Sequence, residues 1–77
     1  MRANFMSLHL QDFPDVLTAE QVADVLQCSV EHVYTMWRKR QMPHFKVGRL
    51  VRMHKRTLIE WIESQQKLEI AGVEGEL

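Results

Sequence analysis

Two short stretches of the chain place apolar residues at helical spacing and follow each other closely. In the first stretch the apolar stripe has the spacing i, i+3, i+4 and i+7 and consists of Ala19, Val22, Ala23 and Leu26. Thr18 and Gln21 have the spacing of a capping box, in which the two side chains satisfy free backbone N–H groups of the first helical turn. The pattern predicts a short helix that begins after Thr18 and ends near Gln27.

A second helix is predicted to run from Ser29, a favourable N-cap residue, through Arg40. The stripe of this helix that faces the core consists of Val30, Val33, Met36 and Trp37. Its outer face is polar and becomes basic along the helix; it carries Glu31, His32, Thr35, Arg38 and Lys39, with Tyr34 at the border. Only Gln27 and Cys28 separate the two helices, so they are expected to meet across a tight turn.

Residues 44–53 alternate between apolar and polar around a glycine, as the two strands of a hairpin do, and they follow the helix-breaking pair Met42-Pro43. If the apolar residues of both strands face the core, the cross-strand pairs are Val47 with Val51, Phe45 with Met53, and Lys46 with Arg52. This register requires the odd-numbered connection Gly48-Arg49-Leu50. Opposed like charges destabilise a hairpin, so we expect the pair of cations to meet an anion.

A third helix is predicted over about residues 55–66, with an inward face formed by Leu58, Ile59, Trp61 and Ile62. Residues 1–16 are predicted to form an N-terminal arm, whose apolar residues Phe5, Met6, Leu8 and Leu10 pack either on the domain or on a partner. Residues 67–77 have no clear periodicity and are expected to form an acidic, flexible tail. The chain is therefore expected to hold one mainly α domain of the α+β class over residues 17–66.

Charge is unevenly distributed along the 77 residues, although the formal net charge is zero. A neutral chain by itself argues against nucleic-acid binding. From His32 to Ile59, however, there are eight basic residues and no acidic residue, whereas residues 1–31 and 60–77 each contain one basic and five acidic residues. A basic run is usually only a solvated face, but here the cations fall on the outer face of the second helix and on the hairpin. This placement indicates an anionic partner.

The stretch LTAEQVADVLQCSVEHVYTMWRKRQMPHFKVGRLVRMHKRTLIEWI, residues 17–62, resembles the DNA-binding domain of excisionases and MerR-like proteins. The resemblance rests on the Leu-Thr helix opening, the helix begun by Ser29 with Val33-Tyr34, the turn at Pro43, the Lys46-Val47-Gly48-Arg49 wing and the closing helix from Leu58 to Trp61. It implies a winged helix-turn-helix fold with a two-stranded wing and a closing C-terminal helix.

The chain departs from that family at four positions. Gln27 stands where glycine is usual, so either a left-handed backbone there costs up to a couple of kcal/mol or the turn takes a different geometry. Cys28 replaces a small aliphatic residue, His54 replaces a proline before the last helix, and Thr35 is less basic than is typical. These changes leave the fold assignment intact, but no base preference is carried over.

The resemblance implies that the second helix enters the major groove of double-stranded DNA and that the wing reaches the adjacent backbone or the minor groove. Glu31 is then expected to accept a hydrogen bond from cytosine N4, His32 and Thr35 to contact base edges or phosphate, and Arg38 and Lys39 to hold the backbone. The full set of predicted DNA-contacting residues is Ser29, Glu31, His32, Tyr34, Thr35, Arg38, Lys39, Lys46, Arg49 and Arg52.

No catalytic or cofactor chemistry is visible in the sequence. There is no carboxylate pair, nucleophile constellation or phosphate-binding glycine loop, and Cys28 with His32 lacks the second pair of ligands that a metal site needs. We therefore expect no enzymatic activity, cofactor or metal. The single cysteine and the lack of a signal peptide or an apolar membrane span predict a cytoplasmic protein.

The leading hypothesis is an excisionase-like recombination directionality factor of a mobile element, which organises or bends DNA for an integrase and associates cooperatively with itself on DNA. A small regulator of transcription is the alternative. Two further readings are a protein-interaction adaptor that has kept the fold, and the DNA-binding subunit of a packaging or recombination enzyme.

Overall fold

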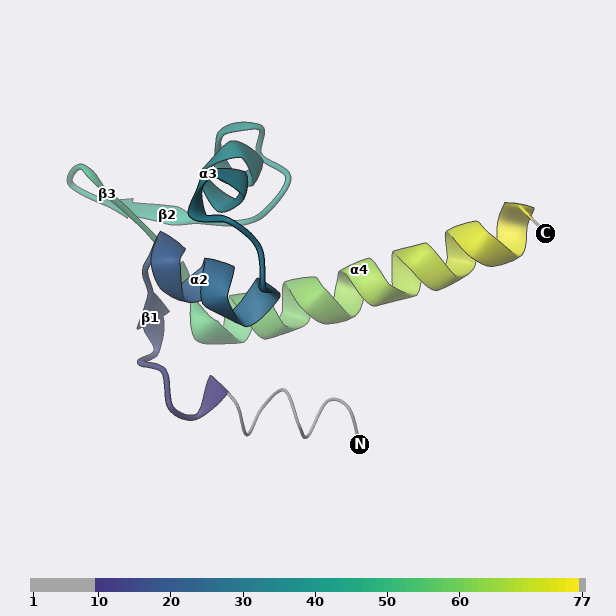
Figure 1. The fold of residues 1–77 in the computed structure, drawn as a ribbon, viewed down its shortest axis with the longest axis horizontal. Coiled ribbons are helices and arrows are strands. Elements are labelled where there is room, and N and C mark those ends of the chain that lie inside the picture. The colour runs from purple at the N-terminus through teal and green to yellow at the C-terminus, as the bar shows by residue number, and fades with distance from the viewer. Residues whose placement is uncertain (1–9, 77) are drawn as a thin grey trace.

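The structure, a computed structural model, describes residues 10–76 of the chain and the side chains of residues 10–67. Its helices are α2 (Ala19–Leu26), α3 (Val30–Arg38) and α4 (Lys55–Glu76), and its strands are β1 (Val16–Leu17), β2 (Phe45–Val47) and β3 (Leu50–His54). In the described part of the chain α2 and α4 pack against the small antiparallel sheet, α3 packs on α2, and the β2–β3 hairpin projects beside α3 (Figure 1). The predicted α+β class, with a hairpin and a closing C-terminal helix, is confirmed.

Both of the first two helices begin at the predicted caps. The Thr18 hydroxyl accepts a hydrogen bond from the Gln21 backbone N–H at 3.1 Å, and the Gln21 side chain accepts one from the Thr18 N–H at 2.9 Å, which completes the capping box. The Ser29 hydroxyl accepts from the His32 N–H at 3.0 Å. These caps fix where α2 and α3 start, and the Ser29 cap also marks the end of the turn between the two helices.

α2 ends at a residue with left-handed backbone geometry. Gln27 has φ 58° and ψ 47°, and the Cys28 N–H donates to the Ala23 carbonyl at 3.0 Å. This is the bonding of a Schellman motif, which usually places glycine at the left-handed position. The sequence left open whether this turn keeps the left-handed geometry without a glycine, and the structure shows that it does, at Gln27.

The hairpin has a different register from the predicted one. Phe45 pairs with Arg52, Lys46 with Val51 and Val47 with Leu50, so the connection is the two-residue turn Gly48-Arg49. Gly48 has φ +62°, the left-handed geometry that two-residue hairpin turns favour. The predicted pairs Val47–Val51, Phe45–Met53 and Lys46–Arg52 are wrong, and the argument from opposed cations no longer applies.

The observed register moves two predicted core residues to the solvent. Phe45 and Val47 are 40% and 56% exposed, on the same sheet face as Leu50 and Arg52. A shift of one residue in one strand exchanges the two faces of that strand. The core is filled without them, because the inner face of the sheet is occupied by Leu17 and Met53, both fully buried.

Part of the predicted N-terminal arm belongs to the domain. β1 pairs with β3 through Val16–His54 and Leu17–Met53, and Leu10 is buried in the core. The Lys55 ammonium donates to the carbonyls of Leu10 and Phe13 at 3.2 and 3.0 Å. Of the two alternatives for Leu10, packing on the domain is therefore the correct one, whereas Phe5, Met6 and Leu8 lie outside the described residues.

α4 closes the core with its first two turns and then leaves it. Leu58 is fully buried, and Ile59, Trp61 and Ile62 pack against the core from partly buried positions. The helix continues to Glu76, away from the body of the domain, so the predicted end near Gln66 is wrong (Figure 1). Glycine alone disfavours a helix by only about 1 kcal/mol and does not stop one as proline does. The division of the chain into arm, domain and flexible tail stays a prediction.

Candidate nucleic-acid interface

α3 is fixed to the domain by one side and leaves the opposite side free. Val33 and Trp37 are almost fully buried, at 0% and 2% exposure. The predicted contact residues lie on the remaining surface: Ser29, Glu31, His32, Tyr34, Arg38 and Lys39 are exposed, and Thr35 is half-buried. A helix held rigidly by its core face and polar on its outer face can be inserted into a groove of a polar polymer without rearrangement.

Several residues of this face also bond to one another. The Ser29 hydroxyl caps α3 by accepting a hydrogen bond from the His32 N–H, so its oxygen is already engaged when no ligand is bound. The Arg38 guanidinium donates to the Thr35 hydroxyl at 3.2 Å. Thr35 and Arg38 therefore act as a connected pair, with the hydroxyl proton of Thr35 still available for donation.

The predicted cations of the wing do not lie on one edge. Lys46 shares a sheet face with Val51 and points to the side of α3, whereas Arg52 is on the opposite face. The Arg52 guanidinium donates to the Val51 carbonyl at 2.9 Å. Arg49 is exposed in the turn itself. The hairpin therefore presents Arg49 at its tip and Lys46 toward α3, and Arg52 lies on the opposite face of the sheet.

A pocket of about 270 Å³ opens between α3 and the hairpin. Most of its lining is polar or aromatic and comes from both elements and the loop between them, and one residue is aliphatic: Tyr34, Trp37, Arg38, Arg40, His44, Lys46 and Val51. The structure brings together three predicted residues here, Tyr34, Arg38 and Lys46. It adds two that the predicted set of DNA-contacting residues did not include, namely Arg40 and His44.

The aromatic rings that line this pocket contact one another. Trp37 contacts Tyr34 edge to face, with ring centroids 5.8 Å apart, and contacts the His44 ring at 5.7 Å. The Trp37 indole is therefore the wall on which His44 rests. A histidine directly after a helix-breaking Met-Pro pair and seven residues after a buried tryptophan was a weak signal, and only the fold gives it meaning.

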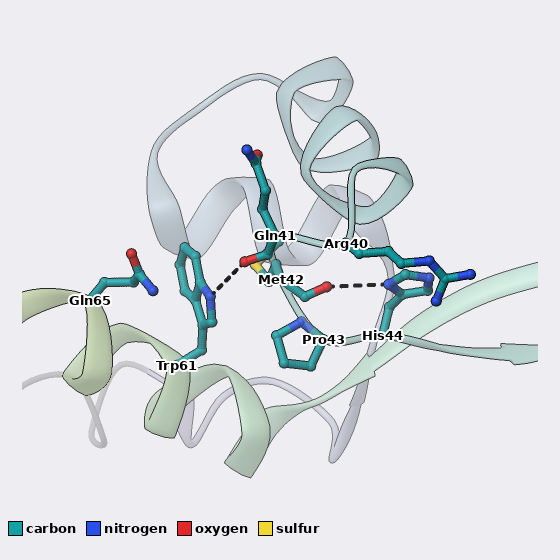
Figure 2. A pocket seen from close by; sticks show the side chains of 7 residues that line it. All are labelled: Arg40, Gln41, Met42, Pro43, His44, Trp61 and Gln65. Carbon is teal, nitrogen blue, oxygen red and sulfur yellow. Dashed lines mark hydrogen bonds between the residues drawn. The ribbon is translucent and has the colours of Figure 1, made fainter. Parts of the chain in front are cut away.

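The loop that carries Arg40 and His44 is tied to α4. The Trp61 indole N–H donates to the Gln41 carbonyl at 3.1 Å, and His44 Nδ1 lies 3.3 Å from the Met42 carbonyl (Figure 2). A second pocket of about 460 Å³ lies along this loop and the Trp61 and Gln65 side chains. Figure 2 shows Arg40 and His44 extending to the same side of the loop, away from Trp61.

The described residues form neither a metal site nor a membrane-spanning helix. Among the described residues, no three metal-binding side chains gather, and Cys28 is a free, half-buried thiol. Within that part of the chain, too, no helix has the length and apolar character required to cross a membrane.

Comparison with protein families matches residues 16–66 to the helix-turn-helix domain, from β1 to the middle of α4. The chain belongs to this family. Its α2 and α3 are the two helices of the motif, and α3 is the second one, which lies in the major groove in helix-turn-helix proteins. No curated protein and no solved structure matches the chain. A helix-turn-helix domain implies DNA binding and typically carries no catalytic activity.

Proposed function

We propose that the protein binds double-stranded DNA, with α3 in the major groove and the β2–β3 hairpin against the adjacent backbone. The observation that carries the proposal is the composition of the cleft between these two elements. Arg38, Arg40 and Lys46 reach it from three different segments, and no acidic side chain lines it. Cations gathered from separate elements on one concave surface are suited to a phosphate backbone.

The outer face of α3 supplies the proposed base contacts. Glu31 can accept a hydrogen bond from cytosine N4, and His32 and Thr35 can contact base edges. Ser29, Tyr34, Arg38 and Lys39 border this stripe and are proposed to position the helix on the phosphates, together with Lys46, Arg49 and Arg52 of the wing. In this arrangement three residues read the sequence, and the others supply most of the affinity.

We further propose an excisionase-like role, in which several copies bind repeated sites and organise DNA for an integrase. The residues of the resemblance support it, and so does the size of the domain. A single module of this kind buries about 600 to 1,000 Å² on DNA, which is too little for high specificity. The segments on either side of residues 16–66 are the proposed contacts between neighbouring copies or with the integrase.

The test begins with selection of bound duplexes from a random pool, followed by fluorescence anisotropy on the selected site at several salt concentrations. Six to eight phosphate contacts give a slope of log affinity against log salt of roughly −5 to −7. A single-stranded oligonucleotide of the same sequence is the control and should bind more weakly. A flat salt dependence, or equal binding of single and double strands, contradicts the proposal.

A duplex that carries two adjacent copies of the selected site separates the roles. Cooperative occupancy supports the excisionase-like array. Independent occupancy of the two sites favours the small transcription regulator instead, because such a regulator does not need neighbouring copies to contact each other.

A further inference from the structure

The pocket between α3 and the hairpin has a chemistry that the general proposal of DNA binding does not specify. Four side chains that are, or can become, cations face it: Arg38 from α3, Arg40 and His44 from the loop, and Lys46 from β2. Tyr34 adds a hydroxyl, and no acidic residue lines the pocket. A group that satisfies these donors must be compact, anionic and rich in acceptor oxygens.

We infer that this pocket binds one phosphate of the DNA backbone, and that Arg40 and His44 are two of its ligands. The inference rests on the proposed DNA binding and narrows it to one phosphate and two residues that the sequence pattern did not indicate. An arginine guanidinium offers the planar set of N–H donors that matches phosphate oxygens, and Lys46 and Arg38 add charge from the two walls.

Arg40 is held in place by the end of α3. Its backbone is left-handed, with φ 58°, and its N–H donates to the Trp37 carbonyl at 3.1 Å. The next residue, Gln41, donates its N–H to the Met36 carbonyl at 2.9 Å and accepts the Trp61 indole N–H. The backbone on both sides of Arg40 is therefore fixed, and a ligand that is positioned in advance loses less entropy on binding.

His44 is held by its ring. Its Nδ1 lies 3.3 Å from the Met42 carbonyl, so Nδ1 carries the proton and donates to that oxygen. In the neutral ring Nε2 is then an acceptor, which a phosphate oxygen repels. Nε2 can donate to a phosphate oxygen only when both ring nitrogens carry a proton. The charged groups around the ring are Arg38, Arg40 and Lys46, with the Tyr34 hydroxyl; the α4 residues nearby, Trp61 and Gln65, are uncharged.

The decisive experiment replaces single phosphates of the selected duplex by neutral methylphosphonates, one position at a time. Binding is measured for the unchanged protein and for Arg40→Gln, His44→Gln and the control Lys67→Ala, which removes an exposed cation of α4. At one phosphate, neutralisation should weaken the unchanged protein about tenfold, as expected for a charge-assisted hydrogen bond. The same neutralisation should weaken Arg40→Gln and His44→Gln at pH 6 by less than threefold, whereas Lys67→Ala should respond as the unchanged protein does.

A second readout uses pH. Affinity of the unchanged protein should rise between pH 8 and pH 6, and His44→Gln should lose most of that rise while keeping its helical circular dichroism. His54→Gln is the matched control, because His54 is exposed and lies outside both the pocket and the proposed set of DNA-contacting residues; this variant should keep the full rise in affinity between pH 8 and pH 6.

The third arm identifies the source of the phosphate. In NMR spectra the His44 ring signals should shift when duplex is added at micromolar concentration. Inorganic phosphate should shift them only at millimolar concentration. Saturation by micromolar inorganic phosphate would assign the pocket to a free phosphorylated ligand and overturn the inference. So would equal methylphosphonate effects in Arg40→Gln and the unchanged protein at every position, with DNA binding intact. If the unchanged protein binds no duplex at all, the proposed function fails and the inference fails with it.

Discussion

Replacing Gln27 by glycine should stabilise the protein. Gln27 is left-handed at the end of α2, and its side chain is exposed. A left-handed backbone costs a residue with a Cβ atom about 1 to 2 kcal/mol, and glycine does not pay this cost. Glycine is also freer in the unfolded chain, which offsets about 0.5 to 1 kcal/mol of the gain. The net stabilisation is therefore expected to be about 0.5 to 1 kcal/mol.

For a domain of this size, 1 kcal/mol corresponds to a shift in Tm of roughly 4 to 8 °C. Thermal unfolding followed by circular dichroism should give Gln27→Gly a Tm about 3 to 6 °C higher, and urea unfolding should give a higher midpoint with an unchanged m-value.

Gln27→Ala is the control, because alanine also removes the side chain but keeps the Cβ atom. It should give no increase in Tm. The reasoning is refuted if alanine and glycine stabilise equally, which would point to the lost side chain, or if glycine lowers the Tm, which would mean that the left-handed backbone is not present in solution.

Three other substitutions test the fold and the site. Leu17→Ala should cost about 2 to 5 kcal/mol of unfolding free energy, whereas Val47→Ala should cost less than about 0.5 kcal/mol in urea unfolding; a large cost at Val47 would restore the register in which it faces the core. Lys55→Ala removes two charge-assisted bonds to the carbonyls of Leu10 and Phe13 and should cost about 1.5 to 3 kcal/mol, against almost nothing for Lys67→Ala. Arg49→Ala should weaken binding to all duplexes alike, while His32→Ala should change the preferred sites in a repeated selection; an unchanged preference would remove His32 from sequence reading.

The first two helices were predictable because their signals are local. The Thr18 and Gln21 pair and the Ser29 cap each act within one helical turn, and the apolar stripe follows directly from the helical period. The family pattern showed that a glycine was missing at Gln27, but the sequence alone left open whether the turn keeps a left-handed backbone or takes another geometry.

The hairpin register was not predictable from alternation, because two registers that differ by one residue both keep some apolar residues inside. Phe45 and Val47 favoured the wrong register. The choice depends on the two-residue turn at Gly48 and on β1, which supplies Leu17 to the inner face of the sheet. A strand of two residues that pairs with a segment far along the chain leaves no periodic signal.

The phosphate pocket was only partly visible for a similar reason. Tyr34, Arg38 and Lys46 fall on predicted elements, so their exposure follows from the pattern. Arg40 and His44 lie in the loop after α3. The path of this loop is set by the left-handed backbone of Arg40 and by the hydrogen bond from the Trp61 indole to the Gln41 carbonyl. Neither of these is encoded in the neighbouring residues alone.

The two non-glycine residues with a left-handed backbone in the described part of the chain differ in what a substitution by glycine would change. Gln27 and Arg40 occupy equivalent places at the ends of α2 and α3, so a screen for heat resistance alone would favour glycine at both. At residue 27 nothing else is lost. At residue 40 the same change removes the guanidinium from the pocket, and stability and DNA affinity move in opposite directions. An engineered thermostable form of this domain can therefore accept the first glycine but must keep the strained arginine.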